Sequence, residues 1–296
     1  MARVIAIANQ KGGVGKTTTA VNLGASLAAS EQRTLIIDCD PQANTTSALG
    51  FPKDPARRTL YQALILGESI ERITLDAKVE GLDLVPSDKN LVGASIELVS
   101  LENREYRLKE AIRVARDKYT YILIDCPPSL DLLAVNALAS ADSVLVPIQC
   151  EYLALEGVSE LLDTLMRLRR TVNPSLEIEG ILLTMYDDRT TLSKQVAADL
   201  RSYFGPQVFE SVIPRNVRLA EAPSHGLPVM FYDIHSKGAE AYVQLAKEVI
   251  TNAQKRVGQG IERPDTRTRA ATAASGDSSS TIDGGSGSRG PGPGSE

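Results

Sequence analysis

The sequence predicts an α/β protein with a mostly parallel, twisted sheet that carries helices on both faces. Two observations predict this class. Apolar residues make up 43% of the 296 residues but aromatic residues only 4%, so the core must consist mainly of Val, Ile, Leu and Ala. Such a core suits buried parallel strands better than an aromatic-rich β-sandwich. In addition, β-rich runs alternate with helical periodicity along most of the chain, which is typical of this class.

Seven short apolar runs are expected to be strands. They cover Val4–Ala8, Thr34–Ile37, Leu82–Val85, Tyr121–Ile124, Ser143–Ile148, Glu177–Met185 and Val208–Ile213. Several are apolar at consecutive positions, which is typical of strands that are buried on both faces. Apolar stripes with helical spacing begin between them at Ala20, Val158 and Tyr242. The alternation predicts a single domain over residues 1–257.

Composition limits what the rest of the chain can do. Residues 258–296 are expected to form a disordered tail, because 19 of these 39 residues are Gly, Ser or Pro and little apolar area is left to bury. The net charge of −5 argues against coating DNA through bulk positive charge but allows a local basic patch. No apolar run approaches the ~20 residues that span a bilayer, and the N-terminus leads into a strand rather than a signal peptide. The three cysteines form no CxxC pair, which favours a reducing compartment. Together, these observations predict a cytoplasmic protein without membrane association.

A glycine-rich loop between the first strand and the first helix is typical of phosphate binding. It reads Asn9-Gln10-Lys11-Gly12-Gly13-Val14-Gly15-Lys16-Thr17-Thr18. Backbone N–H groups of such a loop and the dipole of the following helix bind phosphates. Lys16 can reach the β- and γ-phosphates, and the Thr17 hydroxyl can ligate Mg²⁺. The general pattern GxxxxGK[ST] requires a glycine where Gln10 stands, and the loop has an additional lysine, Lys11. The sequence therefore predicts a single-domain P-loop NTPase.

Two acidic segments follow predicted strands and can complete the site. Asp38-Cys39-Asp40 comes after the second strand, and Asp125-Cys126-Pro127 comes after the strand Tyr121–Ile124. Ligands of open α/β sheets bind at the carboxyl ends of parallel strands. Because phosphoryl transfer depends on a well-placed Mg²⁺, we expect Asp125 to hold this ion. Asp38 is expected to be structural.

The loop KGGVGKTTT resembles the deviant Walker A loop of the ParA/MinD group of P-loop ATPases. The resemblance implies an ATP-dependent homodimer with two ATP molecules between the subunits. In that arrangement Lys11 crosses to the partner's nucleotide and acts in catalysis with Lys16. The resemblance also implies that Asp40 positions or activates the attacking water and belongs to the magnesium site with Thr17 and Asp125.

Three further stretches resemble chromosomal partition ATPases of the ParA/Soj type: DCDPQANTTSALG, DCPPSLDLLAVNAL and IPRNVRLAEAPSHGLPV. The resemblance implies binding of double-stranded DNA without sequence preference, association with the nucleoid and stimulation of a slow ATPase by a ParB-type centromere-binding protein. The final residues GSGSRGPGPGSE have no apolar face that could insert into a membrane, unlike the end of MinD-type proteins. An alternative stays open, in which the protein is a nucleotide switch that regulates replication initiation or transcription.

The resemblance also assigns residues outside the loop. Pro214 and Asn216 match a Pro-x-Asn segment that lies against adenine in relatives, although Pro214 can equally end a strand. Arg189 and Arg218 match two arginines implicated in DNA binding, and Arg215 stands near them. Nitrogenase-type relatives hold an iron–sulfur cluster between subunits. Cys126, however, lies in an ordinary ParA-type loop, and the other cysteines lack cluster spacing, so we expect no cluster.

Overall fold

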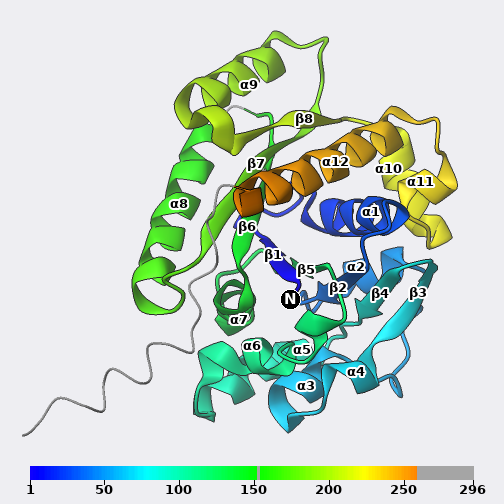
Figure 1. Ribbon diagram of the computed structural model, residues 1–296, viewed down its shortest axis with the longest axis vertical. Coiled ribbons are helices and arrows are strands. Elements are labelled where there is room, and N and C mark those ends of the chain that lie inside the picture. The colour runs from blue at the N-terminus through cyan, green and yellow to red at the C-terminus, as the bar shows by residue number, and fades with distance from the viewer. Residues whose placement is uncertain (152–153, 259–296) are drawn as a thin grey trace, which may run out of the picture. The chain divides into compact units, whose positions relative to one another are not determined.

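The central element is one eight-stranded sheet with the order β3-β4-β2-β5-β1-β6-β7-β8 (Figure 1). The structure, a computed structural model, describes residues 1–151 and 154–258. The strands are β1 (Arg3–Ile7), β2 (Thr34–Asp38), β3 (Leu75–Val79), β4 (Leu82–Val85), β5 (Tyr121–Asp125), β6 (Ser143–Gln149), β7 (Glu177–Tyr186) and β8 (Val208–Pro214). All neighbouring strands are parallel except β3 and β4. The predicted fold class is confirmed, and each predicted strand is present within one or two residues.

The sequence did not predict strand β3. Among the described strands it pairs only with β4, in an antiparallel hairpin whose tight turn contains Gly81 at φ 79°. Its residues Asp76 and Lys78 are exposed, and the pairing is interrupted by an irregularity between Asp76 and Val79. A short, half-polar edge strand leaves little apolar signal in the sequence, because only one neighbour and one face hold it in place.

Helices cover both faces of the sheet, as predicted. They are α1 (Lys16–Ala29), α2 (Asn44–Ala48), α3 (Leu60–Leu66), α4 (Ile70–Ile73), α5 (Leu91–Glu97), α6 (Arg107–Ala111), α7 (Leu132–Ser140), α8 (Ala154–Thr171), α9 (Thr191–Phe204), α10 (Val217–Glu221), α11 (Val229–Tyr232) and α12 (Lys237–Gly258). The predicted helical stripes from Ala20, Val158 and Tyr242 lie on α1, α8 and α12, with their apolar residues mainly buried.

The core forms two layers, one on each side of the sheet. Val4 and Ala6 of β1 point into the layer beneath α3, α5, α6, α7, α8 and α9, whereas Ile5 and Ile7 point into the layer beneath α1, α2, α10 and α12. In Figure 1, α1 and α12 accordingly lie on one side of the strands, and α5, α6 and α7 lie on the other. The carboxyl ends of the parallel strands therefore meet at one edge between the two layers, where the sequence places its candidate site.

The chain divides into two units, Met1–Asn252 and Ala253–Glu296. The site described below lies in the first unit. The predicted tail lies, from residue 259 onward, outside the described residues. Within the described ranges, no helix combines the length and the apolar character that a membrane span requires.

Candidate functional site

The glycine-rich loop connects β1 to α1 and leaves the start of the helix open. Gly13 (φ 75°) and Gly15 (φ 92°) adopt left-handed backbone conformations, which side-chain-bearing residues rarely take. Gly15 is the N-cap of α1 and, as a glycine, offers no side-chain acceptor to the N–H groups of the first turn. A Cβ at Gly12 would have no neighbour within 4 Å, so the space beside the loop is open. Uncapped N–H groups at a helix N-terminus are suited to bind an anion such as phosphate.

The neighbouring strands hold the loop in place. The Thr184 hydroxyl of β7 donates a hydrogen bond to the Val14 carbonyl at 2.9 Å, and Val14 itself is buried. The Asn9 side chain donates to the Pro147 carbonyl of β6 at 2.8 Å and accepts from the Lys11 N–H at 2.9 Å. Contacts from two strands fix the loop before any ligand binds, which lowers the entropy cost of binding.

The two lysines of the loop have different surroundings. Lys16 is buried, and its ammonium donates to the Lys11 carbonyl at 3.1 Å. Burial lowers the pKa of Lys16, and the nearby Asp125 opposes this shift. The Lys11 ammonium instead points outward and lies 3.0 Å from a carboxylate oxygen of Glu151, with 54% of the Lys11 side chain exposed. An exposed ion pair of this kind is weak, so Lys11 can leave Glu151 at small cost.

Asp125 is the centre of a buried polar cluster at the carboxyl end of β5. One of its oxygens accepts hydrogen bonds from the Thr17 hydroxyl at 2.8 Å and from the Thr45 hydroxyl at 2.7 Å. The other oxygen is buried and has no hydrogen-bond partner among the described residues. Burial raises the pKa of Asp125 to about 6, although both hydroxyls favour its charged form. A carboxylate oxygen without a donor, beside a threonine hydroxyl, fits the oxygen ligands that Mg²⁺ prefers.

Thr45 is a site residue that no sequence motif predicted. The sequence signal for it is the stretch DCDPQANTTSALG, in which two adjacent threonines follow Asn44, the first residue of helix α2. Only the folded chain shows that the first of them reaches Asp125, which is 80 residues away in sequence.

Asp38 and Asp40 both follow β2 but have different environments. Asp38 is fully buried and accepts hydrogen bonds from the Thr46 N–H (2.8 Å), the Thr46 hydroxyl (2.7 Å) and the Asp40 N–H (3.2 Å). Burial is the main cause that raises the pKa of Asp38 to about 8, and the negative charge of Asp125 is the second. Asp40 accepts from the Gln42 N–H at 2.9 Å and is close enough to raise the pKa of Asp125. Asp38 thus anchors α2, which fits the structural role expected of it.

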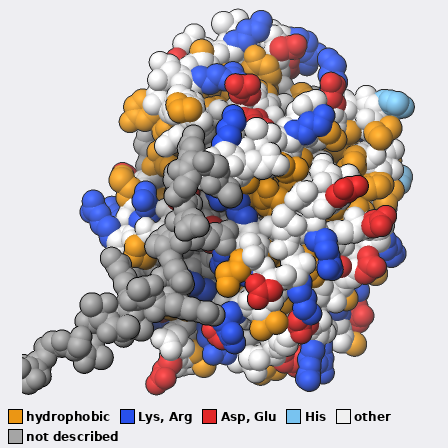
Figure 2. All heavy atoms as spheres, viewed as in Figure 1, with side chains coloured by type: hydrophobic (Ala, Val, Ile, Leu, Met, Phe, Trp, Pro, Cys, Tyr) orange, Lys and Arg blue, Asp and Glu red, His pale blue; other side chains and the backbone are white. Residues whose placement is uncertain are grey.

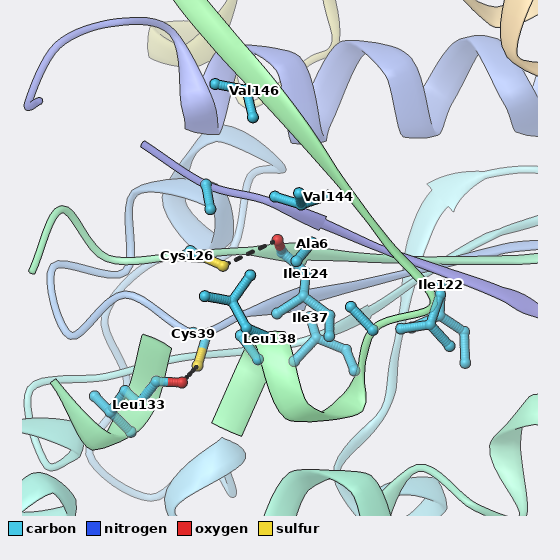
Figure 3. Packing of buried hydrophobic residues seen from close by; sticks show 14 of the residues in the cluster. Ala6, Ile37, Cys39, Ile122, Ile124, Cys126, Leu133, Leu138, Val144 and Val146 are labelled. Carbon is cyan, nitrogen blue, oxygen red and sulfur yellow. Dashed lines mark hydrogen bonds between the residues drawn. The ribbon is translucent and has the colours of Figure 1, made fainter. Parts of the chain in front are cut away.

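Cys39 directly follows β2 and Cys126 directly follows β5, and both side chains lie in the core layer beneath α7 (Figure 3). The Cys39 thiol donates to the Leu133 carbonyl and the Cys126 thiol to the Ile124 carbonyl, each at 3.7 Å. Burial raises the pKa of both thiols. Across the described residues there is no group of three His, Cys, Asp or Glu side chains that could hold a metal ion. The two thiols behave as small core residues.

Pro214 and Asn216 lie at the end of β8. Pro214 is the last residue of the strand and pairs with Tyr186 of β7. The Asn216 side chain accepts from the Arg218 N–H at 2.9 Å and caps α10. Pro214 also lines an open groove of about 320 Å³, together with Tyr186, Ser211, Val212, Lys237, Glu240, Ala241 and Gln244. Both residues have a local structural role, and their contact with adenine stays a prediction.

The two candidate DNA arginines are paired with carboxylates of their own segments. Arg189 donates to Asp187 at 2.8 and 2.7 Å, with 82% of its side chain exposed, and this bond lowers the pKa of Asp187 to about 2. Arg218 lies 2.7 Å from Glu221 and 3.2 Å from Asp233. Figure 2 shows Lys and Arg side chains interspersed with Asp and Glu on the viewed face. The arginines follow the neighbouring strands β7 and β8, so the fold brings them to the same edge of the sheet as the glycine-rich loop.

Comparison with known proteins agrees with this geometry. A family model described as an AAA domain matches residues 2–178. The chain is 52% identical over 248 residues to the chromosome partitioning protein ParA of Myxococcus xanthus, a match that covers 84% of this chain and 88% of the relative. It is also 52% identical over 252 residues to the sporulation initiation inhibitor protein Soj of Bacillus subtilis, covering 85% of this chain and all of that protein.

Solved structures show the same fold. A protein of Mycobacterium smegmatis described as cobyrinic acid a,c-diamide synthase, with bound ADP and magnesium, superimposes with a TM-score of 0.75 at 35% identity, over 86% of this chain and 96% of that one. The cell division ATPase MinD of Pyrococcus furiosus gives a TM-score of 0.70 at 29% identity, over 85% and 99%. The glycine-rich loop, the sheet and the high identity to proteins of one kind lead to the same conclusion: the chain belongs to the ParA/Soj family of chromosome partitioning ATPases.

Proposed function

We propose that this protein binds ATP with Mg²⁺ in the loop between β1 and α1 and hydrolyses it slowly. The observation that carries this proposal is the cluster below the glycine-capped start of α1, where Thr17 and Thr45 donate to one oxygen of Asp125. Among the described residues, the other oxygen has no hydrogen-bond partner. Thr17 and Asp125 would hold the Mg²⁺, which supplies charge neutralisation between the phosphates. The M. smegmatis protein that carries ADP and magnesium supports this assignment.

The proposal also gives roles to the remaining site residues, and their positions support them. Lys16 is buried beside the loop and neutralises the β- and γ-phosphates, while the backbone from Gly12 to Thr18 cradles them. Asp40 lies close to Asp125 and orients the attacking water. Pro214 and Asn216 contact the adenine from the end of β8.

ATP drives formation of a homodimer in this proposal, with Lys11 crossing to the partner's nucleotide. The outward position of the Lys11 ammonium, which is paired with the half-exposed Glu151, supports this role. A lysine at the rim of the site can reach another subunit, whereas the buried Lys16 cannot.

The dimer then binds double-stranded DNA without sequence preference through Arg189 and Arg218, in the cytoplasm and on the nucleoid. A ParB-type centromere-binding partner stimulates hydrolysis and releases the dimer. Each subunit contributes both arginines, so one dimer offers paired contacts to the phosphate backbone. The name of the M. xanthus relative supports a role in chromosome partitioning.

A salt titration of DNA binding tests this proposal. Arg189→Glu and Arg218→Glu should each flatten the slope of log affinity against log salt by about 1.8, because a dimer loses two phosphate contacts at about 0.9 each. The effect should be equal on unrelated DNA sequences, and ATP binding should be retained.

Arg113→Glu provides a matched control. Arg113 is also exposed and pairs with a glutamate three residues away, Glu110, but it lies just after α6, on the opposite side of the sheet from α10. This variant should keep the wild-type slope. Unchanged slopes in the Arg189 and Arg218 variants would remove both residues from the DNA surface.

A second candidate function is a nucleotide switch that regulates replication initiation or transcription. The B. subtilis relative is named as an inhibitor of sporulation initiation, which favours keeping this candidate. The two functions differ in what a DNA-binding variant does in cells. If Arg218→Glu abolishes DNA binding but the regulatory phenotype persists, the switch is the primary function.

A further inference from the structure

Two glycines from distant parts of the chain meet backbone to backbone beside the nucleotide site. Gly50 (φ 83°) follows α2, and Gly226 (φ 66°) ends the short 3₁₀ helix η5 (Ala222–His225). A Cβ at Gly226 would lie 2.5 Å from the Gly50 Cα, and a Cβ at Gly50 would lie 3.1 Å from the Gly226 carbonyl oxygen. We call this contact the glycine junction. No side chain fits between the two backbones, so neither can approach the other further.

The Gly50 side of the junction is tied to the carboxylates of the nucleotide site. Helix α2 ends two residues before Gly50. Its Thr45 hydroxyl donates to Asp125 at 2.7 Å, and its Thr46 N–H and hydroxyl donate to Asp38. Asp125 belongs to the nucleotide site and also accepts the hydrogen bond of Thr45. A change in what Asp125 binds therefore changes the hydrogen bond that fixes the position of α2.

The Gly226 side is tied to the candidate DNA surface. Helix α10 carries Arg218 and continues directly into η5, which Gly226 terminates. Leu219 of α10 and Ala222 of η5 are buried in the same core layer as Ala48 and Leu49 at the end of α2. The segment from α10 to Gly226 is therefore packed against α2 by apolar side chains as well as by the glycine junction.

We propose that the glycine junction couples the state of the nucleotide site to the position of Arg218. This inference rests on the function proposed above, because it names how DNA binding is regulated by ATP. Packed backbones transmit displacement since close-packed interiors yield little. A shift of α2 that follows from a change at Asp125 moves Gly50, and the abutting Gly226 moves with it. The segment that positions Arg218 is displaced in turn.

Hydrogen exchange of residues 217–226 measures this coupling without DNA. In the wild type, we expect ATP to change the exchange rate of this segment several-fold relative to the nucleotide-free protein. In Gly226→Ala and in Gly50→Ala, ATP should still protect residues 11–18 but change residues 217–226 by less than about twofold. Gly50→Ala is the milder variant, since its Cβ needs a shift of only tenths of an ångström.

Gly81→Ala is the matched control. Gly81 has a similar backbone conformation (φ 79°), so alanine there meets the same backbone strain, but its Cβ would have ordinary contacts of 3.8 Å with Ala28. This variant should keep the wild-type response of residues 217–226. A loss of the response in Gly81→Ala would overturn the proposal, because general strain would then explain the effect.

DNA affinity provides the second readout. The ratio of affinities with ATP and with ADP should fall about tenfold in the junction variants and stay unchanged in Gly81→Ala. A full exchange response in a junction variant that binds ATP overturns the coupling, as does the absence of any response in the wild type. Loss of ATP binding in both junction variants also overturns it, because the junction would then belong to the nucleotide site itself. If the wild type shows the exchange response but binds no DNA, the proposed function fails while the coupling stands.

Discussion

Replacing Thr45 by valine removes one hydroxyl and keeps the shape of the side chain. Thr45 is fully buried and donates to Asp125 at 2.7 Å. A hydrogen bond to a charged acceptor contributes about 1.5–3 kcal/mol, compared with about 0.5–1.5 kcal/mol for a neutral one. The free energy of unfolding should therefore fall by about 2 kcal/mol where Asp125 is charged and by about 1 kcal/mol where it is protonated.

The pH dependence gives this prediction its sign. The folded pKa of Asp125 is about 6, above its ordinary value of 3.8, so the folded protein holds this proton more tightly than the unfolded chain does. The contribution of Asp125 to the free energy of unfolding consequently falls as pH rises between these two pKa values and is constant above them. The Thr45 hydroxyl lowers this pKa, so Thr45→Val should raise the pKa of Asp125 further. In the variant, the free energy of unfolding therefore continues to fall up to a higher pH than in the wild type. The difference between variant and wild type should grow from pH 5 to pH 8.

Urea unfolding of the nucleotide-free protein in EDTA, at pH 5, 6, 7 and 8, measures this difference. Subtracting the wild type removes the part of the Asp38 contribution that both proteins share. Because the charge of Asp125 also raises the pKa of Asp38, a change in the titration of Asp125 shifts that of Asp38 in the same experiment. Thr45→Ser keeps the hydroxyl and should retain the wild-type pH profile. A loss of stability that does not change with pH, or a serine variant as affected as the valine variant, would refute the reasoning.

Three further variants address the nucleotide site. Lys16→Ala should lose ATP binding, measured with a labelled nucleotide, because the cradle loses the buried charge that faces the phosphates; wild-type affinity would contradict the loop assignment. Asp40→Ala should bind ATP and accumulate as a dimer on size exclusion while hydrolysis stops, and a monomer with normal turnover would contradict the role in positioning water. Lys11→Ala should bind ATP yet remain monomeric, because no charge crosses to the partner's nucleotide, whereas an ATP-dependent dimer in this variant would argue against a dimer that holds ATP between its subunits.

The sequence alone determined the features that depend on neighbouring residues. The left-handed conformations of Gly13 and Gly15, the open start of α1 and the order of strand, loop and helix arise within about fifteen residues. The parallel sheet followed from strands that are apolar at consecutive positions, because such strands must be buried on both faces. The motif stretches likewise identified the family, since their residues are adjacent in the chain.

Only the tertiary structure decided which distant groups meet. Thr45 lies in a stretch that resembles the family, yet its contact with Asp125 depends on how α2 packs beside β5, and no local pattern encodes this distance. The edge strand β3 was missed because its single hairpin partner, rather than its own apolar pattern, holds it in the sheet. The charged partners of Arg218 and the meeting of Gly50 with Gly226 depend on long-range packing in the same way. Local conformational preferences determined the loop, whereas the contacts that link it to the rest of the protein arise from burial and close packing of segments far apart in the chain.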